Sequence, residues 1–302
     1  MKIKGFIHSV ELSLNNYCSL QCAGCSSLNP DSSKSINMDF SPVLNILKDI
    51  DIKHFVLCGN NGEPLEHPDI AQILLKINES FPNSTVHVST NGEKIKQKLF
   101  SVTPKLKNVH FQIAIDGPKS SIHELTRKKG NLDLVFENVQ FLIDHQADLS
   151  LIYSRHQLNE NETAKTSELI MQKFGLELQF RDTTQVTETI KPPVKLSKNG
   201  NVSILYTPQT SSRDFVPNMK NLYIECNGES YPCVSFCKHK TDVKQVNITE
   251  YQNSVQFLKD FVKFQSEFCH RYQETGDLRQ CNLNCGIYRN FRYDTIEDLK
   301  AL

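Results

Sequence analysis

The chain has 302 residues, which is enough for one large or two medium domains with a substantial core. Lysine and arginine together number 34, the same as aspartate and glutamate, so no net charge attracts nucleic acid or an anionic membrane. No apolar run approaches the roughly 20 residues that span a bilayer, and the N-terminus lacks the apolar core of a signal peptide. We therefore expect a cytoplasmic protein with neither nucleic acid nor membrane as a partner.

Between residues 6 and 185, short runs of alternating apolar residues take turns with longer helical patterns. The expected strands are Ser9–Leu14, His54–Leu57, Thr85–Ser89, His110–Ile115, Leu149–Tyr153 and Leu176–Phe180. The expected helices lie near Phe40–Ile50, Pro68–Ser80, Gly92–Leu99, Leu132–His145 and Glu160–Phe174. This alternation predicts parallel β/α units joined by right-handed crossovers. The units are too few for a closed eight-stranded barrel, so the predicted fold class is α/β, with a partial (β/α)6 barrel over residues 1–185.

The alternation of strand and helix patterns stops after the last expected strand. Residues 186–220 contain Pro192-Pro193 and Asn199-Gly200, which predicts a linker or an irregular region. Asn227-Gly228 between two alternating runs indicates a β-hairpin, and residues 254–268 carry the broad apolar face of a helix. Residues 221–302 are therefore predicted to form a smaller, cysteine-rich domain made of a hairpin and a helix.

Three of the chain's 10 cysteines, Cys18, Cys22 and Cys25, follow the first expected strand. Ten cysteines without an export signal favour metal ligation in a reducing compartment over disulfides. Three thiolates this close can hold one polynuclear centre, but a structural zinc normally takes four protein ligands. An iron–sulfur cubane with three cysteine ligands leaves one iron open to a small molecule. A zinc loop completed from a distant segment and three ordinary buried cysteines are the alternatives.

A second motif, Cys58-Gly-Asn-Asn-Gly-Glu-Pro64, follows the second expected strand. Glycines at a strand end let the backbone approach a ligand closely. The Glu63 carboxylate is suited to accept hydrogen bonds from an ammonium group. Taken alone, the segment is equally typical of a turn, and Cys58 is equally typical of a small buried strand residue.

The Cys-x3-Cys-x2-Cys spacing resembles the cluster loop of the radical S-adenosylmethionine (SAM) enzymes, and residues 59–64 resemble their Gly-Gly-Glu region. In that family, SAM chelates the open iron of a [4Fe-4S] cluster through its amino and carboxylate groups. One-electron cleavage of SAM then gives methionine and a 5′-deoxyadenosyl radical. The aromatic residue that usually precedes the third cysteine is Gly24 here, so Tyr17 is the candidate for the adenine contact.

Further motifs occur in the family's order along the chain. Ser89-Thr90-Asn91-Gly92 closes the third strand, Ala114-Ile115-Asp116-Gly117 closes the fourth, and Ser154–Asn159 follows the fifth. Ala114 stands where relatives often have serine, which removes one hydroxyl contact. Arg127 matches an arginine that relatives use against the SAM carboxylate. The resemblance implies SAM contacts at Tyr17, Gly59, Asn61, Gly62, Glu63, Asn91, Asp116, Arg127 and Asn159.

The remaining cysteines gather near the C-terminus, at Cys226, Cys233, Cys237, Cys269, Cys281 and Cys285. Gly228-x4-Cys233 and Cys281-x3-Cys285 are similar to the twitch and SPASM extensions of radical SAM enzymes, which hold auxiliary iron–sulfur clusters. The shorter twitch version, with one auxiliary [4Fe-4S] cluster, fits this number of thiols. Its expected ligands are Cys233, Cys269, Cys281 and Cys285, with Cys226 and Cys237 as alternates. A structural zinc site that includes His239 or His270 is the other possibility.

The resemblance implies a radical SAM enzyme of oxidoreductase type, with flavodoxin or ferredoxin as electron donor. Its radical would abstract a hydrogen atom from a small-molecule or peptide substrate, with an oxidative outcome. Epimerase or peptide-maturase activity is an alternative, for which Cys58 could donate the hydrogen atom. Only 17 residues precede Cys18, which counts against a leader-peptide module. Outside this class, a non-catalytic iron–sulfur carrier or sensor and a zinc-stabilised binding protein are the rivals.

Overall fold

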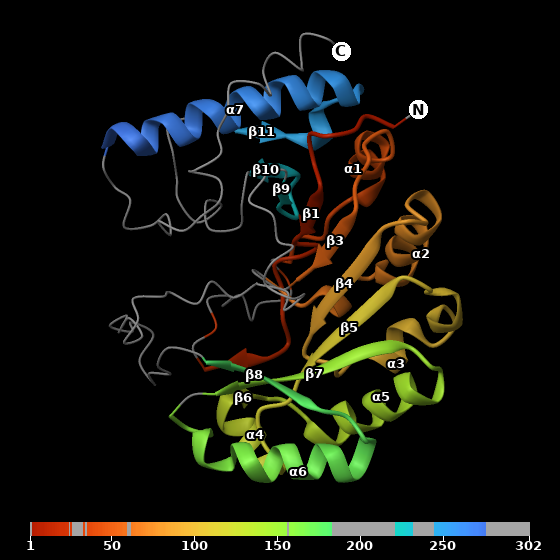
Figure 1. Cartoon of the computed structure of the whole chain (residues 1–302), viewed down its shortest axis with the longest axis vertical. Helices are drawn as coiled ribbons and strands as arrows, with labels where there is room; N and C mark the ends of the chain where they lie inside the picture. Colours follow the sequence, from red (N-terminus) through yellow and green to blue (C-terminus); the bar gives the residue numbers. More distant parts are fainter. Residues whose placement is uncertain are drawn as a thin grey trace. The chain divides into compact units, whose positions relative to one another are not determined.

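The computed structural model describes residues 2–23, 25, 33, 35–58, 62–155, 157–182, 221–231 and 245–275, with side chains in the last helix up to Gln265 (Figure 1). These residues belong to two compact units. One unit comprises Met1–Leu12, Met38–Phe55 and Ile204–Leu302, and the other comprises Ser13–Asn37 and Val56–Ser203. The predicted linker 186–220 and several predicted ligands lie outside the described residues: Gly59, Asn61, Cys233, Cys237, Cys281, Cys285 and the side chain of Cys269.

The unit of residues 13–37 and 56–203 contains parallel strands that alternate with helices (Figure 1). The strands β4 (Thr85–Thr90), β5 (Val109–Ala114), β7 (Asp148–Arg155) and β8 (Leu178–Asp182) lie side by side in that order, each parallel to the next. The helices are α2 (Ile70–Ser80), α3 (Ile95–Leu99), α4 (Ser120–Thr126), α5 (Leu132–Asp144) and α6 (Thr163–Phe174). Strand β3 (His54–Leu57) lies at the division between the units.

Local sequence explains where these elements run and stop. In β4, Val86 and Val88 are buried while His87 between them is half-exposed, which is the period of two expected of a strand with one face in the core. Helix α5 begins after Asn131, whose side chain accepts a hydrogen bond from Leu134 N. Helix α6 ends at Gly175 in the left-handed conformation (φ 67°).

A short antiparallel ladder in the same unit joins β2 (Gln21–Cys22) to β6 (Arg127–Lys128). Four 3-10 turns complete the described elements of the two units, at η2 (Pro64–Glu66), η3 (Thr103–Lys105), η4 (Glu160–Glu162) and η5 (Ile248–Glu250). Neither the ladder nor α4 was expected, because two- and seven-residue elements are too short to show a periodic pattern.

The other unit pairs the two ends of the described chain. Its strands follow the order β11 (Val246–Asn247), β10 (Glu229–Tyr231), β9 (Asn221–Ile224) and β1 (Ser9–Leu12), and β9 is parallel to β1. Its helices are α1 (Phe40–Leu47) and α7 (Ser254–Thr275). Ser254 Oγ donates to Ile46 O and contacts Asp49 Oδ2, each at 2.9 Å, so the start of α7 is fastened to the end of α1.

The expected strands are all present, as β1, β3, β4, β5, β7 and β8. The predicted hairpin is confirmed, because β9 and β10 are antiparallel with Ser230 opposite Ile224. The expected helix at Gly92 begins only at Ile95, since Gly92 has a positive φ of 83°. Among the described helices, none is both long enough and apolar enough to span a membrane.

The hairpin turn provides a test of the packing around β9 and β10. Gly228 has a φ of 88°, and a Cβ there would lie 2.5 Å from Asn247 Oδ1 and 2.7 Å from Thr249 Cγ2. Gly175 has a similar φ of 67° but open space around it. Gly228→Ala should therefore lower the free energy of unfolding by about 1–3 kcal/mol more than Gly175→Ala, as measured by urea denaturation. Equal losses would show that only backbone strain acts at Gly228.

Candidate functional site

The cysteine loop follows β1 in the chain, and its short strand β2 pairs with β6. Cys22 is part of β2 and pairs with Arg127, while Ala23 N donates to Thr126 O at 2.7 Å. Cys25 N donates to Cys22 O at 3.2 Å, which turns the chain after the ladder. The thiols of Cys18, Cys22 and Cys25 are half-buried and form no disulfide. The ladder therefore fixes the middle cysteine of the loop by main-chain hydrogen bonds.

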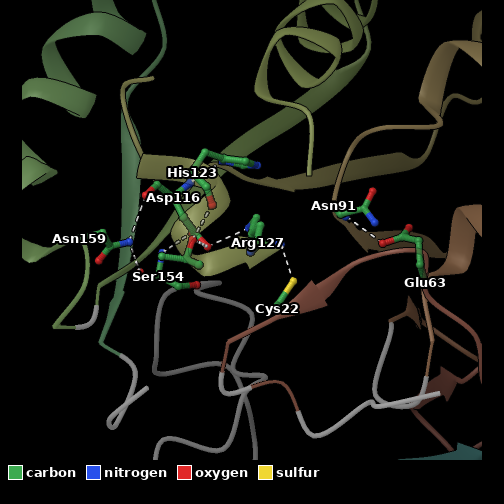
Figure 2. A network of polar contacts seen from close by, with 9 residues as sticks. Cys22, Glu63, Asn91, Asp116, His123, Arg127, Ser154 and Asn159 are labelled. Atoms are coloured by element: carbon green, nitrogen blue, oxygen red, sulfur yellow. Dashed lines mark hydrogen bonds and ion pairs between the residues drawn. The ribbon is translucent and has the colours of Figure 1, made fainter. Parts of the chain in front are cut away.

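Two of the three sulfurs lie beside nitrogen donors. Arg127 NH1 is 4.0 Å from Cys22 Sγ, and Asn91 Nδ2 is 4.0 Å from Cys18 Sγ. Figure 2 shows Arg127 between Asp116 and Cys22. Burial raises the pKa of Cys22 to about 11, although the Arg127 guanidinium opposes the rise. Burial, with the Glu63 carboxylate adding to it, also raises the pKa of Cys18 well above its ordinary value.

These thiols fit a bound cluster. Since burial disfavours the thiolate forms of Cys18 and Cys22, a cationic metal centre would hold them deprotonated at neutral pH. Within the described ranges, no three His, Cys, Asp or Glu side chains converge so as to hold a single metal ion. In a cubane each cysteine binds a different iron, so three sulfurs need not converge on one point. The three cysteines therefore fit a cluster in which each binds one iron.

The Glu63 main chain connects the segment after β3 to the segment after β1. Glu63 N donates to Tyr17 O, and Asn15 Nδ2 donates to Glu63 O, both at 2.8 Å. A Cβ on Gly62 would lie 2.7 Å from Asn15 O and from Tyr17 N, and would collide with the Asn15 side chain. Glycine is required at position 62 because these two backbone segments approach too closely for a side chain.

The Glu63 carboxylate is buried, with only 5% of the residue exposed. Its Oε1 accepts hydrogen bonds from Thr90 Oγ1 at 2.5 Å and Leu65 N at 3.1 Å, and its Oε2 accepts one from Asn91 N at 2.9 Å. Burial raises the pKa of Glu63 to about 7, even though these donors favour the ionised form. The carboxylate thus joins η2 to the end of β4, as Figure 2 shows for Asn91.

A second buried carboxylate, Asp116, follows β5. Its Oδ1 accepts from Ser154 N at 3.1 Å, and its Oδ2 accepts from Thr126 Oγ1 at 3.2 Å and pairs with Arg127 Nε at 2.8 Å. Its main-chain N donates to His123 Nδ1 at 3.3 Å. Burial alone would lower the pKa of Arg127, but Asp116 and then Cys22 reverse this and raise it above its ordinary value.

Asn159 extends this network to β7. Its Nδ2 donates to Asp116 O at 3.1 Å and to Ser154 O at 3.0 Å, and its own carbonyl accepts from Tyr153 OH at 2.7 Å. The structure therefore places Asp116, Arg127 and Asn159 in one polar network (Figure 2). Their side chains hold strand ends together, and their expected contacts with SAM stay predictions.

The structure describes the side chains of three other predicted site residues, Tyr17, Cys58 and Cys226. Tyr17 is half-buried, and Cys58 is 1% exposed directly after β3, which agrees with a small buried strand residue. Cys226, the described alternate ligand, lies in the hairpin turn, and burial raises its pKa to about 11. Asn15, Thr126 and His123 join the polar contacts of the site without having been expected from the sequence, and Thr90 was expected only as part of its motif. Their signal was a polar residue at the end of a strand or short helix, which a single sequence does not distinguish from a solvated loop.

A row of polar side chains lies on the face of the β4–β5–β7–β8 sheet opposite Val86 and Val88. His87 stacks on His110 with 5.2 Å between ring centroids, and His110 Nε2 is 2.8 Å from Ser150 Oγ. Arg181 NH2 donates to Gln112 Oε1 at 3.4 Å. Burial lowers the pKa of His87 to about 4. These side chains place hydrogen-bonding groups on one face of the sheet, whereas Val86 and Val88 on the other face are buried.

Parallel β/α units with a three-cysteine loop and buried carboxylates at their strand ends define the class as a β/α-barrel fold with its polar residues gathered at the strand ends. The family profile of the radical SAM superfamily matches residues 12–170, so the chain belongs to the radical SAM superfamily. That family implies a SAM-binding [4Fe-4S] cluster. No curated protein sequence matches the chain.

Solved structures of SuiB and anSMEcpe are among those similar in fold. SuiB of Streptococcus suis bound to the precursor peptide SuiA has a TM-score of 0.62 and 14% identity over 82% of this chain and 63% of that chain. Histidine-tagged anSMEcpe bound to AdoMet has a TM-score of 0.62 and 16% identity over 98% and 96%. Native anSMEcpe with AdoMet and the Cp18Cys peptide has a TM-score of 0.57 and 17% identity over 83% and 79%.

The chain spans just under two thirds of the SuiB chain. At these identities the likeness concerns the fold, and with the alternating strands and helices it confirms the predicted α/β class with a partial barrel.

The hydrogen bond from Thr90 to Glu63 should contribute to the free energy of unfolding by an amount that depends on pH. A carboxyl whose pKa is raised to about 7 stabilises the fold fully below its unfolded pKa, and this stability is lost as pH rises through 7. At about pH 8.5, Thr90→Val removes a donor to a charged group and should cost about 1.5–3 kcal/mol. At about pH 5.5 the cost should fall to about 1 kcal/mol.

Thr166→Val is the matched control for Thr90→Val, because buried Thr166 donates to the Glu162 carbonyl. Urea denaturation at the two pH values measures both variants. The cost of Thr166→Val should not change with pH, and an equally constant cost for Thr90→Val would contradict the ionisation assigned to Glu63.

Proposed function

We propose that this radical SAM enzyme binds its cluster through Cys18, Cys22 and Cys25, cleaves SAM reductively and abstracts a hydrogen atom from a peptide or small polar substrate. The observation that carries the proposal is the docking of the cysteine loop. Cys22 lies in β2, which is hydrogen-bonded to β6. The Cys18 sulfur lies 4.0 Å from a side-chain nitrogen of Asn91, and the Cys22 sulfur lies 4.0 Å from one of Arg127. When bound there, the cluster would supply the electron that splits SAM into methionine and a 5′-deoxyadenosyl radical.

The SAM site is proposed to lie against Glu63. Each carboxylate oxygen has two lone pairs; Oε1 uses both on Thr90 and Leu65, while Oε2 uses one on Asn91. Counting only donors from the described residues, Oε2 therefore keeps one acceptor position, which suits the ammonium group of SAM. Charge supports this as well, because an ammonium beside a carboxylate of raised pKa would restore its ionised form.

The remaining SAM contacts follow from position and resemblance. Asn91 adjoins Cys18, Gly62 lets the backbone approach, and Tyr17 is the proposed adenine contact. Gly59 and Asn61 are proposed from the resemblance alone. Asp116 and Asn159 are proposed to shape the ribose end of the site through the strand ends that they hold.

A peptide or small polar substrate is supported by two observations. SuiB has been solved with a precursor peptide and anSMEcpe with the Cp18Cys peptide. The row of His87, His110, Gln112 and Arg181 offers hydrogen-bonding groups along the sheet, which suits a polar substrate better than an apolar one. Flavodoxin or ferredoxin is the proposed electron donor.

An auxiliary [4Fe-4S] cluster is proposed at Cys233, Cys269, Cys281 and Cys285, with Cys226 and Cys237 as alternates. Its support is the number and spacing of the thiols. Such a cluster would accept an electron from the substrate radical, which is why we propose an oxidative outcome. Hydrogen-atom donation by Cys58 belongs to the epimerase alternative.

Iron content tests the cluster assignment. Anaerobically reconstituted protein should hold roughly eight irons per chain, and replacement of Cys18, Cys22 and Cys25 by alanine should remove about four of them and abolish formation of 5′-deoxyadenosine. Cys58→Ala, outside both ligand sets, should keep the full iron content. Unchanged iron content in the triple variant would refute the assignment of Cys18, Cys22 and Cys25. One zinc with about four irons in the wild type would show that the C-terminal cysteines hold a structural zinc ion.

SAM affinity tests the role of Glu63. Glu63→Gln should weaken SAM binding by about 1.5–3 kcal/mol, the range for hydrogen bonds to charged groups, with iron content retained. Because the pKa of Glu63 is about 7 in the free protein, wild-type affinity should fall as the pH drops below 7, and the variant should lose this dependence.

Glu66→Gln is the matched control for Glu63→Gln. Glu66 is also shielded from solvent, and it pairs with Lys94 at 2.5 Å. Calorimetry should show wild-type SAM affinity in this variant. Equal affinities in all three proteins would place the SAM ammonium elsewhere.

The outcome of the reaction is tested with deuterated water and the substrate, once it is identified. An oxidation should consume SAM stoichiometrically and leave no deuterium at the product carbon, because no hydrogen atom returns to it. Deuterium fixed at that carbon, and lost in Cys58→Ala, would establish epimerisation instead. Mass spectrometry of the product makes the distinction.

A further inference from the structure

We infer that Arg127 is a positioning residue that sets the reduction potential of the cluster through Cys22, a role separate from binding the SAM carboxylate. The inference rests on the proposed function, because it takes Cys22 as a cluster ligand. It departs from what the family resemblance alone implies for this arginine, and it comes from the contacts of its guanidinium.

The first observation is the pairing of β2 with β6. Cys22 and Arg127 are direct partners across an antiparallel ladder, and Ala23 N donates to Thr126 O at 2.7 Å. Directly opposed residues of such a ladder have neighbouring side chains. Arg127 NH1 lies 4.0 Å from Cys22 Sγ as a result, and Figure 2 shows this contact. The main chain therefore keeps the arginine at this sulfur.

The second observation is the anchoring of the guanidinium by Asp116. Arg127 Nε is 2.8 Å from Asp116 Oδ2, and the side chains are only 14% and 5% exposed. Asp116 is held in turn by Ser154 N and Thr126 Oγ1. One edge of the planar fork thus faces a fixed carboxylate while NH1 faces the sulfur.

Electrostatics gives the direction of the effect. Reduction adds one negative charge to an iron–sulfur cluster, and hydrogen bonds and charge near the sulfurs set its potential. A cation near a ligand sulfur in a medium of low dielectric stabilises the reduced form. Arg127 should therefore raise the midpoint potential, and Asp116, which partly neutralises it, should lower that potential.

The two partners therefore predict shifts of opposite sign. Arg127→Met removes the positive charge and should make the midpoint potential of the SAM-binding cluster more negative. Asp116→Asn removes the negative charge and should make it more positive. Arg127→Lys keeps the charge and should stay closer to the wild type than Arg127→Met does. A purely structural role for the pair would shift the potential in the same direction in both charge-removing variants.

Lys128→Met is the matched control for Arg127→Met. Lys128 is the next residue of β6, exposed, and its loss changes the net charge of the chain equally. The midpoint potential should be unchanged in this variant, because an exposed charge is screened by solvent.

The experiment is a redox titration of the reconstituted full-length chain, followed by electron paramagnetic resonance. The signal that changes when SAM is added identifies the SAM-binding cluster, and iron is counted in each variant. If Asp116→Asn does not retain iron, the comparison of Arg127→Met with Arg127→Lys decides. Equal midpoint potentials in the wild type and in an iron-loaded Arg127→Met variant would overturn the inference. A wild type that assembles no SAM-responsive cluster would instead refute the proposed function.

Discussion

The buried ion pair between Asp116 and Arg127 is the interaction on which the arrangement of the site depends. Asp116 collects donors from Ser154 at the end of β7 and from Thr126 at the end of α4, and it orients Arg127 toward Cys22. Removing one partner of such a pair leaves an uncompensated buried charge, which costs about 3–5 kcal/mol. The pair therefore stabilises the fold and also determines which side of the cysteine loop faces a positive charge.

Glu63 and Asp116 have similar structural roles: Glu63 links the segment after β3 to the end of β4, and Asp116 links the segment after β5 to the end of β7. Each carboxylate follows a strand and accepts hydrogen bonds from the end of a neighbouring strand, so each holds two strand ends together. The difference between them is the counter-charge. Asp116 has Arg127, whereas Glu63, among the described residues, has three donors but no ion-pair partner. That difference explains why burial raises the pKa of Glu63 to about 7.

The strands and long helices were predictable because their apolar periods are long enough to read, as in β4 and α5. The three-cysteine loop and Glu63 stand out in the sequence by residue type and spacing, and their roles at the cluster and at SAM stay predictions. The β2–β6 ladder, the parallel pairing of β9 with β1 and the contacts of Asp116 were not predictable. These depend on residues far apart in sequence, such as Cys22 and Arg127, whose pairing leaves no local pattern.

The two sides of the cysteine loop are therefore electrostatically different, and this bears on how SAM is oriented. On the Arg127 side, a cation already lies beside Cys22, and its charge is shared with Asp116. On the Glu63 side, a buried carboxylate near Asn91 and Cys18 retains acceptor capacity with respect to the described part of the chain. A zwitterionic amino-acid group placed between them is favoured with its ammonium toward Glu63, because the opposite orientation sets two anionic groups together in a medium of low dielectric. At the proposed site, the direction of SAM binding would thus be set by charges that the fold already holds in place.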